Sequence, residues 1–366
     1  MARMNLRNRV KKRAEEKKVA QKHRALARYY NLNSALGNSW AIFYVIVGGR
    51  KTGKSYSVTD FLCRQKAKLG KHCKNYWMRI SETSIKAMLQ NNADKLVDPD
   101  LKRKYDLDLK VKGMDVFNKY QKGKKNQDVF MTVTPLSQFG KLKGVGFYDK
   151  DYDGWYNIVL DEFQLEIGEK RTSFDILYNF IGMCENIART TKNKIRVFLL
   201  GNTLEEASTV LKAFNFLPEK FGRFYLKSKK CLIDNLEPTD EYFKDREGSI
   251  ADILGGDQMS NYTNELSKDV SLIDKSRVTH PVAIIKFTKS KADWFTMWDK
   301  NIIKKYNGEH MPESYDFCMR PYLSSYFSKE KKNAILDMYD ARTLKFNNLI
   351  TQSYFQEALM KIRKNA

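Results

Sequence analysis

The feature that most constrains this chain is a glycine-rich segment, GGRKTGKS, at residues 48–55. It follows a run of β-branched and aromatic residues at 41–47, which predicts a strand, and it precedes a helical pattern at 56–69. The segment fits G-x-x-x-x-G-K-[ST] in full, and a strand before it with a helix after it is the setting in which this pattern forms a phosphate-binding loop. A chance glycine-rich turn is the alternative, but it leaves the flanking strand and helix unexplained.

Each part of the segment has a physical task. Gly48 and Gly53 let the backbone turn tightly, so that its N–H groups face phosphate oxygens, and the following helix adds its positive N-terminal end. Lys54 supplies a positive charge to the β- and γ-phosphates, and the Ser55 hydroxyl is a ligand for Mg²⁺. The predicted cofactors are therefore ATP and Mg²⁺. The predicted nucleotide-binding residues are Gly48, Gly49, Arg50, Lys51, Thr52, Gly53, Lys54 and Ser55.

A second predicted strand ends in two carboxylates, because the apolar residues at 158–160 are followed by Asp161 and Glu162. Parallel strands of one sheet end at the same edge, so we expect both side chains to lie beside the glycine-rich loop. There Asp161 reaches the water shell of Mg²⁺ and Glu162 polarises the attacking water. Two acids after a strand also occur in ordinary turns. Their pairing with an upstream phosphate loop favours an ATPase that uses water over a kinase or a GTPase.

A third predicted strand, at 195–200, leads into Gly201 and Asn202. A polar side chain at this strand tip can contact the γ-phosphate or the attacking water, so Asn202 is predicted to sense hydrolysis; an ordinary Gly-Asn turn is the alternative. Phosphoryl transfer also needs a cation that stabilises the transition state, often from a neighbouring subunit. Arg189, at the end of a helix predicted at 174–189, is our first candidate. The weaker candidates are Arg50, Arg79 and Arg196.

Strand and helix patterns alternate through this part of the chain. Further apolar strands are predicted at 75–80 and 129–133. Such alternation is typical of an α/β fold with a mainly parallel sheet flanked by helices. Residues 101–126 are rich in lysine and weakly patterned, so we expect an exposed insertion there.

The length of 366 residues predicts two globular units, or one large unit with an appendage. We expect, in chain order, a basic N-terminal arm at 1–30, a P-loop ATPase domain at 31–220, a linker or lid at 221–238 and a smaller α+β domain at 239–366. The last of these has a predicted strand at 282–287 and predicted helices at 294–306 and 353–364.

Charge narrows the choice of partner, because 66 lysines and arginines against 43 acidic residues give a net charge of +23. Such an excess favours a polyanion, since contacts of Lys and Arg with phosphates drive nucleic-acid binding that ignores sequence. No apolar run approaches the roughly 18 to 20 residues of a membrane-spanning helix, so no membrane partner is expected. The five cysteines lack C-x-x-C spacing, which argues against a disulfide framework or a zinc site.

Three segments together resemble the viral DNA-packaging ATPases, the terminase-like branch of the additional-strand P-loop class. They are GGRKTGKS after an aromatic strand, IVLDEF at 158–163 and LLGNT at 199–203. The pattern is most similar to the φ29-type podophage packaging ATPases. This resemblance implies a homopentameric ring at the portal vertex of an empty prohead in the host cytoplasm. Such a ring drives double-stranded DNA inward with ATP, uses a structural RNA as a scaffold, and places Arg189 as a trans-acting arginine finger.

Large terminases carry a C-terminal RNase H-like nuclease with clustered carboxylates that hold two metals. No such set is obvious here, since the predicted strand at 282–287 carries Lys286 and no acid. The resemblance to φ29-type motors therefore implies a degenerate nuclease-like domain that binds DNA or RNA without cutting it. The grip on DNA must ignore base sequence, and its candidate contacts are the lysine-rich segments 119–125 and 141–143.

Two other functions stay open from the sequence. One is a helicase-type ATPase that nucleic acid stimulates outside a capsid. The other is a non-catalytic basic scaffold that keeps a P-loop fold without turnover.

Overall fold

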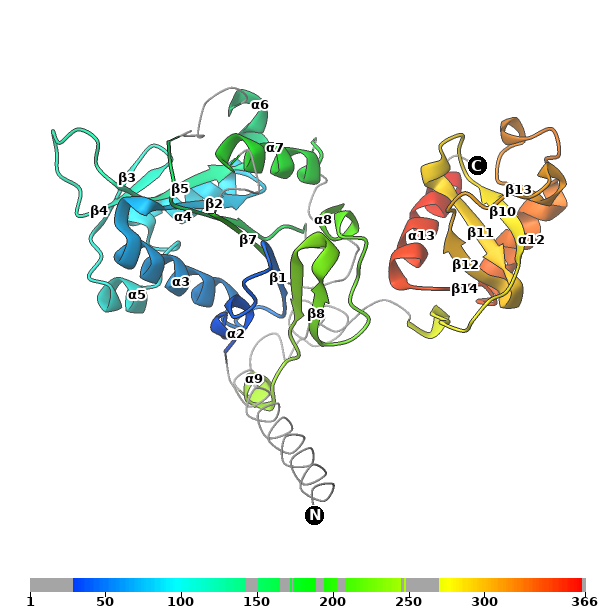
Figure 1. Ribbon diagram of the computed structural model, residues 1–366, viewed down its shortest axis with the longest axis horizontal. Coiled ribbons are helices and arrows are strands. Elements are labelled where there is room, and N and C mark those ends of the chain that lie inside the picture. The colour runs from blue at the N-terminus through cyan, green and yellow to red at the C-terminus, as the bar shows by residue number, and fades with distance from the viewer. Residues whose placement is uncertain are drawn as a thin grey trace, which may run out of the picture. The chain divides into compact units, whose positions relative to one another are not determined.

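The computed structural model describes residues 29–142, 151–164, 172, 174–188, 194–202, 209–244, 247 and 270–363. The chain forms two compact units (Figure 1). Of the described residues, the first unit holds those up to 202 together with 209–210 and 220–247, and the second holds 211–219 and 270–363. The predicted basic arm at 1–30 lies outside the described residues except for Tyr29 and Tyr30.

The first unit is built on a nine-stranded sheet with the order β3-β4-β5-β2-β6-β7-β1-β9-β8. The strands from β5 to β9 in this order run parallel, and β3, β4 and β8 add antiparallel edges. This arrangement confirms the predicted α/β fold with a mainly parallel sheet. The strands are β1 (Phe43–Val47), β2 (Cys73–Arg79), β3 (Leu109–Lys112), β4 (Asp115–Asn118), β5 (Val129–Pro135), β6 (Trp155–Asp161), β7 (Lys194–Gly201), β8 (Gly222–Leu226) and β9 (Cys231–Asn235).

The register of the central strands brings three strand ends to one edge of this sheet. Val47 of β1 pairs with Gly201 of β7, and Asp161 of β6 pairs with Leu200. β7 therefore lies between the strand that enters the glycine-rich loop and the strand that ends in the two carboxylates. This is the strand order that the additional-strand prediction requires. The residues that follow β1, β6 and β7 meet at this edge because parallel strands point the same way.

Helix α3 (Lys54–Leu69) fixes the position of the loop that precedes it. It begins directly after Gly53, whose φ of 85° marks the change from loop to helix. On its buried face, Val58 and Phe61 belong to the core of the sheet, and the Phe61 ring lies 5.6 Å from that of Phe198 on β7. Burying a side chain of this size contributes about 1.5–3 kcal/mol. Packing on the sheet thus holds the helix start beside the strand edge.

Of the remaining described helices of the first unit, the one at 82–93 packs against β2, β3 and β5, and the one at 176–188 packs against β6. These remaining helices are α2 (Asn33–Leu36), α4 (Glu82–Ala93), α5 (Pro99–Lys104), α6 (Phe139–Leu142), α7 (Ile176–Ala188) and α9 (Asp240–Lys244). The start of α4 is capped by Ser81, whose side chain accepts a hydrogen bond from the N–H of Ser84. α7 confirms the helix predicted at 174–189 as far as residue 188.

The second unit has a five-stranded sheet with the order β13-β10-β11-β12-β14. Its antiparallel strands β10, β11 and β12 form a meander, and β13 and β14 pair in parallel on either side. The Phe355 ring of α13 lies 5.1–5.4 Å from those of Phe287, Phe295 and Phe346 in an aromatic core. The elements are β10 (Pro281–Lys286), β11 (Trp294–Trp298), β12 (Ile302–Lys305), β13 (Asp316–Cys318), β14 (Lys345–Phe346), α12 (Lys329–Asp340) and α13 (Leu349–Arg363), with α8 (Thr209–Ala213) at the junction with the first unit.

Residues 221–238, predicted as a linker or lid, instead supply β8 and β9 to the large sheet. β9 pairs with β1 along its whole length, and Leu232 and Ile233 are fully buried. The apolar residues 231–233 gain more from burial against β1 than they would in an exposed connection. The boundary predicted at residue 239 also differs, since α9 belongs to the first unit.

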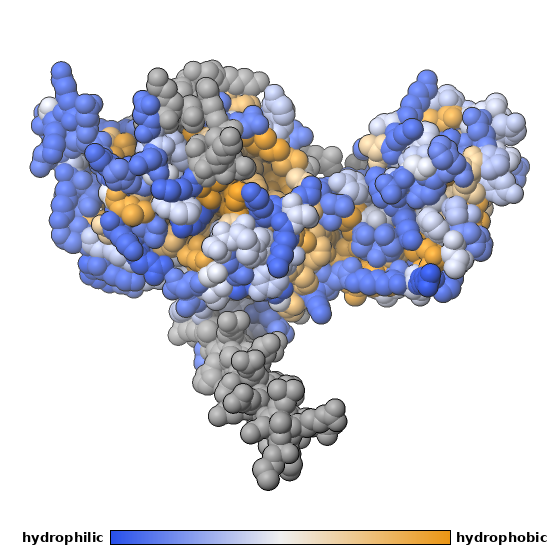
Figure 2. Space-filling view, viewed as in Figure 1, coloured by the Kyte–Doolittle hydropathy of each residue, from blue (hydrophilic) through white to orange (hydrophobic). Residues whose placement is uncertain are grey.

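The helix predicted at 294–306 is wrong, because these residues form the hairpin β11–β12. Phe295 and Met297 point to the buried core, in the alternation of a strand, and the turn uses Lys300 and Asn301 with φ of 62° and 57°. The predicted insertion at 101–126 is exposed in large part, yet it also carries β3 and β4. Figure 2 shows hydrophilic residues covering this side of the first unit. None of the described helices is both long enough and apolar enough to cross a bilayer.

Candidate nucleotide-binding site

The loop between β1 and α3 is shaped by close backbone contacts. A Cβ atom on Gly48 would lie 2.8 Å from the Cβ of Leu236, so a larger residue does not fit there. Gly53 and Lys51 have φ of 85° and 65°, in the left-handed region that suits glycine and strains lysine. The N–H of Gly48 donates to the carbonyl of Gly201 at 3.2 Å. These contacts hold the loop in a curled path at the sheet edge.

Lys54 points into the curl of this loop. Its ammonium donates hydrogen bonds to the carbonyl oxygens of Gly48 at 2.6 Å and Gly49 at 2.8 Å. The hydroxyl of Thr52 lies 3.3 Å from the ammonium and donates to the Gly49 carbonyl at 2.9 Å. Lys54 is only 6% exposed. The positive charge thus lies where a phosphate in the loop would need it.

Burial lowers the pKa of Lys54 to about 8, because desolvation penalises the charged ammonium. The negative charges of Asp161 and Glu162 oppose this shift, and the positive charge of Arg50 adds to it. The structure therefore brings the predicted lysine and both predicted carboxylates into one electrostatic environment. A bound anion would favour the charged form of Lys54, so the loop gains stability from a phosphate ligand.

Asp161 lies at the end of β6 and is 4% exposed. Its Oδ1 accepts a hydrogen bond from the Ser55 hydroxyl at 3.5 Å. Its Oδ2 accepts from Nε of Arg79 at 3.0 Å and from Nη2 at 2.7 Å. Arg79 is the last residue of β2, the strand beside β6. This ion pair offsets the cost of burying the carboxylate, while the oxygen that faces Ser55 lies at the mouth of the loop.

Glu162 follows β6 with an unusual backbone conformation. Its φ is 56°, which strains a residue with a side chain. The side chain is 45% exposed, and its Oε2 lies 3.2 Å from Nη1 of Arg79. Arg79, which the sequence offered as a weaker candidate for the transition-state cation, therefore bridges both carboxylates of its own chain. In this arrangement one carboxylate oxygen of Glu162 is paired with an arginine of its own chain.

The donor set fits a hard divalent cation such as Mg²⁺. The Ser55 hydroxyl and the Asp161 carboxylate are oxygen ligands, and Mg²⁺ is usually held by one or two protein oxygens together with phosphates and water. Among the residues that the structure describes, no group of three or more His, Cys, Asp or Glu side chains could hold a metal by itself. A cation at this edge would thus depend on a bound nucleotide for part of its coordination.

Asn202 lies directly after β7, beside the loop. The Gly201 carbonyl accepts a hydrogen bond from the N–H of Gly48. A Cβ atom on Gly201 would lie 2.9 Å from the ring of Phe163, so the end of the strand is tightly packed. Asn202 is half-buried at this strand tip. Its predicted position at the same edge as the loop and the carboxylates agrees with the structure. Its role as a sensor of hydrolysis stays a prediction.

Two of the candidate arginines are not observed at the loop: Arg189 lies outside the described residues, and Arg196 lies in the first half of β7. Arg189 follows the last described residue of α7 and is not described. Arg196 belongs to the first half of β7 and pairs in register with Asn157, far from the strand end at Gly201. Its guanidinium lies 3.4 Å from the centre of the Trp155 ring, so it packs under the opposite end of the sheet. The lysine at 143 and Thr203 are also outside the described residues.

Two further segments, which contain Tyr30 and Tyr242, are hydrogen-bonded to the loop. The sequence patterns did not predict either contact. The N–H of Tyr30 donates to the carbonyl of Thr52 at 2.8 Å, and the hydroxyl of Tyr242 on α9 donates to the carbonyl of Arg50 at 2.8 Å. Tyr242 is 192 residues from its partner. No local pattern reports a contact of this range, although tyrosines before the first strand and after β9 were visible in the sequence.

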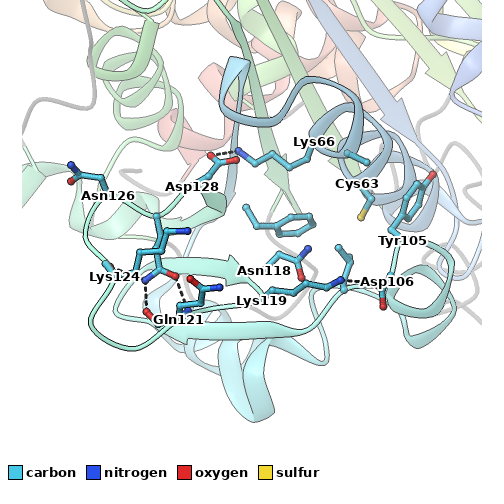
Figure 3. Close-up of a pocket in the computed structure, with 14 residues that line it drawn as sticks. Cys63, Lys66, Tyr105, Asp106, Asn118, Lys119, Gln121, Lys124, Asn126 and Asp128 are labelled. Atoms are coloured by element: carbon cyan, nitrogen blue, oxygen red, sulfur yellow. Dashed lines mark hydrogen bonds and ion pairs between the residues drawn. The ribbon is translucent and has the colours of Figure 1, made fainter.

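A polar hollow of about 600 Å³ lies away from this site, between the second half of α3 and the β3–β4 side of the sheet. Figure 3 shows Lys66 paired with Asp128, at 2.7 Å, and Lys119 paired with Asp106. Lys119 and Lys124 belong to the lysine-rich segment predicted to contact DNA, and both line this hollow. The segment therefore lies on an edge of the first unit that is distinct from the loop.

The fold and the site together fit a P-loop-like α/β fold in which β7 lies between the strand before the loop and the strand that ends in the carboxylates. Among solved structures, it is similar to the Phi-28 gp11 DNA packaging motor, with a TM-score of 0.57 and 13% identity over 91% of this chain and 97% of that one. It is also similar to the bacteriophage Phi-29 viral genome packaging motor assembly, with a TM-score of 0.60 and 18% identity over 92% of this chain and 100% of that one.

Comparison with protein-family models and with curated proteins finds no match. At identities this low, the structural similarity shows the fold. The predicted resemblance to the viral DNA-packaging ATPases is confirmed at that level, and it covers nearly the whole chain.

Proposed function

We propose that this chain is an ATPase motor subunit that packages double-stranded DNA into a viral prohead. The observation that carries the proposal is the meeting of Lys54, Ser55 and Asp161 at one sheet edge, with the Ser55 hydroxyl 3.5 Å from the Asp161 carboxylate. Two segments that lie 106 residues apart in the sequence supply parts that phosphoryl transfer needs. The fold shared with phage packaging motors supports DNA as the load.

In this proposal the N–H groups of residues 48–55 and the charge of Lys54 bind the phosphates of ATP. Ser55 and Asp161 hold Mg²⁺, which when bound neutralises charge on the phosphates. Glu162 orients and polarises the attacking water once it has left Arg79. Asn202 follows β7, the strand between β1 and β6, and contacts the γ-phosphate or that water.

The same proposal assigns the positive charge that stabilises the transition state to Arg189 of a neighbouring subunit in a homopentameric ring. The net charge of +23 supports a polyanionic load. The ring would act at the portal vertex of a prohead in the host cytoplasm, with a structural RNA as a further partner. The second unit would bind nucleic acid without cutting it.

The test is the ATPase rate of the purified chain, measured with and without double-stranded DNA over a range of protein concentrations. We expect DNA to raise the rate, and the rate per subunit to rise steeply with concentration because the site is completed between subunits. Lys54→Ala should abolish ATP hydrolysis and packaging while leaving salt-sensitive DNA binding in place.

Other outcomes would replace the proposal. Strand displacement without proheads would favour the helicase alternative. An absence of ATP hydrolysis at every concentration would favour the scaffold without turnover, and equal loss of DNA binding in Lys54→Ala would contradict separate sites for nucleotide and DNA.

A further inference from the structure

One carbonyl group of the glycine-rich loop is turned toward a helix that lies outside the loop. The carbonyl of Arg50 accepts a hydrogen bond from the hydroxyl of Tyr242 on α9 at 2.8 Å. The peptide that joins Arg50 to Lys51 is trans and planar, so its C=O and N–H groups point in opposite directions. The N–H of Lys51 therefore points away from Tyr242.

A second carbonyl of the loop is held in a similar way two residues further on. The carbonyl of Thr52 accepts a hydrogen bond from the N–H of Tyr30 at 2.8 Å, so the N–H of Gly53 points away from Tyr30. Lys51 and Gly53 both have a left-handed backbone, with φ of 65° and 85°. Left-handed residues within a turn direct successive N–H groups into a concave surface that binds anions.

The two N–H groups are available to a ligand. Among the residues that the structure describes, none accepts a hydrogen bond from the N–H of Lys51 or from that of Gly53. The ammonium of Lys54 lies in the curl of the same loop, where it donates to the carbonyls of Gly48 and Gly49. The loop thus combines two unpaired donors with one positive charge, which suits a chain of phosphates.

The hydroxyl of Tyr242 has a fixed position from which it can restrain the loop. Tyr242 is 5% exposed, its N–H donates to the hydroxyl of Thr239 at 3.2 Å, and its ring lies 5.9 Å from that of Phe243. The left-handed conformation of Lys51 is strained, because Lys51 has a side chain. Without a partner for the Arg50 carbonyl, the peptide would relieve this strain by turning over, and the N–H of Lys51 would turn with it.

We infer that Tyr242 is a positioning residue of the phosphate loop. Its hydroxyl holds the Arg50 carbonyl outward and thereby keeps the N–H of Lys51 directed at the phosphates of the ligand. This inference deepens the proposed ATPase function and rests on it. The restraint acts on the phosphate chain alone, so inorganic tripolyphosphate with Mg²⁺ is a sufficient probe.

The experiment measures the affinities of tripolyphosphate and ATP, both with Mg²⁺, for the full chain and for Tyr242→Phe, which removes only the hydroxyl. The loss of one positioned hydrogen bond should weaken both ligands by the same factor, about threefold to tenfold. The KM for ATP should rise by this factor while kcat changes less than about twofold, because the N–H binds phosphate equally before and during transfer.

Amide NMR distinguishes the two N–H groups of the same loop. In the unaltered chain, tripolyphosphate should shift the amide proton resonances of Lys51 and Gly53 downfield, as new hydrogen bonds to phosphate require. In Tyr242→Phe the shift of Lys51 should be smaller, whereas that of Gly53 should persist because the N–H of Tyr30 still holds its peptide. A general loosening of the loop would change both shifts together.

Tyr105→Phe is the matched control. The hydroxyl of Tyr105 donates to Asp60 on α3 at 3.0 Å, so this variant also removes one tyrosine hydroxyl bond from the first unit. Tyr105 lines the polar hollow that lies away from the loop (Figure 3). The control should leave the affinity for tripolyphosphate unchanged.

An unchanged affinity for tripolyphosphate in Tyr242→Phe would overturn the inference. Equal changes in the Lys51 and Gly53 shifts, or an equal loss of affinity in Tyr105→Phe, would overturn it as well. Failure of the proposed ATPase site looks different, since Lys54→Ala would then bind tripolyphosphate as the unaltered chain does. The two failures are therefore distinguishable in one set of titrations.

Discussion

Each unit of this chain buries one carboxylate against a basic residue of a neighbouring parallel strand. In the first unit Asp161 of β6 pairs with Arg79 of β2, and in the second Asp316 of β13 pairs with Lys286 of β10. The two carboxylates are similarly inaccessible, with residue exposures of 4% and 2%. Judged by the ion pairs alone, the two places are alike.

Their surroundings are different. Asp161 is also bonded to Ser55, is followed by Glu162, and lies at the edge where the glycine-rich loop begins. Asp316 is followed by Phe317 and Cys318 on β13, and the glycine-rich loop at residues 48–55 belongs to the other unit. A buried ion pair by itself is weak evidence for a site, since such pairs also occur in purely structural networks. The order of the strands therefore distinguishes the two pairs, because it brings Ser55 and the glycine-rich loop to the Asp161–Arg79 pair.

The largest effect that separates the two carboxylates is expected for Asp316→Ala. The variant leaves the Lys286 charge buried without its partner, so the second unit should lose about 3–5 kcal/mol of stability. Urea unfolding measures the loss. ATP binding by the folded chain should not change.

The double variant Lys286→Met/Asp316→Leu is the control for that prediction. With both charges replaced by apolar groups, stability should return close to that of the unaltered chain. A reduced affinity for ATP in folded Asp316→Ala would contradict the difference between the two carboxylates.

Lys54 differs from Lys286 in its partners. The Lys54 ammonium donates to backbone carbonyls, whereas Lys286 is paired with the carboxylate of Asp316. Its pKa is about 8 in the folded chain and near 10.5 when unfolded. Between these values the unfolded chain binds more protons, so stability rises with pH; below pH 8 the full penalty of the buried charge remains. Lys54→Met should relieve this penalty, which is about 3 kcal/mol, and the gain should shrink as pH approaches 10.5.

Urea unfolding of Lys54→Met and the unaltered chain at pH 7 and pH 9.5 checks this prediction. The loss of the hydrogen bonds to Gly48 and Gly49 reduces the gain at both pH values and leaves its pH dependence in place. A stability difference that does not change with pH would mean that Lys54 keeps an ordinary pKa.

A smaller effect on the ATPase rate is expected for Arg79→Ala, which frees Glu162 from its ion pair. Because this variant also leaves the buried Asp161 carboxylate without its partner, the rates are compared on the folded chain. Glu162 is 45% exposed, so solvent screens this pair and its release changes rates by about fivefold or less. The ATPase rate without DNA should rise relative to the rate with DNA. Arg79→Lys, which keeps the charge, serves as the control, and an unchanged ratio of the two rates in Arg79→Ala would show that the pair does not restrain Glu162.

The smallest effect is expected at the lysine-rich edge of the first unit. Lys122, Lys124 and Lys125 are exposed, as are Lys227, Lys229 and Lys230 in the turn between β8 and β9. Replacing the first three by Gln should reduce the salt dependence of DNA binding, with a change of about 0.9 in logarithmic slope for each phosphate that the variant no longer neutralises. Replacing the second three should have no such effect, and equal slopes for both triple variants would mean that this segment does not bind DNA.

Local patterns in the sequence predicted much of the first unit. The apolar runs before Gly48, Asp161 and Gly201 are short, continuous and bounded by glycine or acids, so they predicted buried parallel strands. Because parallel strands end at one edge, the meeting of Lys54 with Asp161 followed from the same reasoning.

The features that escaped prediction depend on tertiary contacts. Arg79 lies 82 residues from Asp161, and the Tyr242 bond to Arg50 spans 192 residues. The residues at 294–306 have apolar positions compatible with both a helix and two strands, and only the pairing of β11 with β10 decides between them. Pairing with β1 likewise decides the structure of residues 221–238.

The proposed catalytic role of the β6 carboxylates is tested most directly by the steady-state rate of ATP hydrolysis by Glu162→Gln at saturating Mg²⁺ and ATP, with ATP affinity measured in parallel. Glutamine keeps the shape of the side chain and removes its ability to take a proton. We expect the rate to fall by about 10²–10⁴-fold while ATP binds as it does to the unaltered chain. A rate within twofold of that of the unaltered chain would contradict this role.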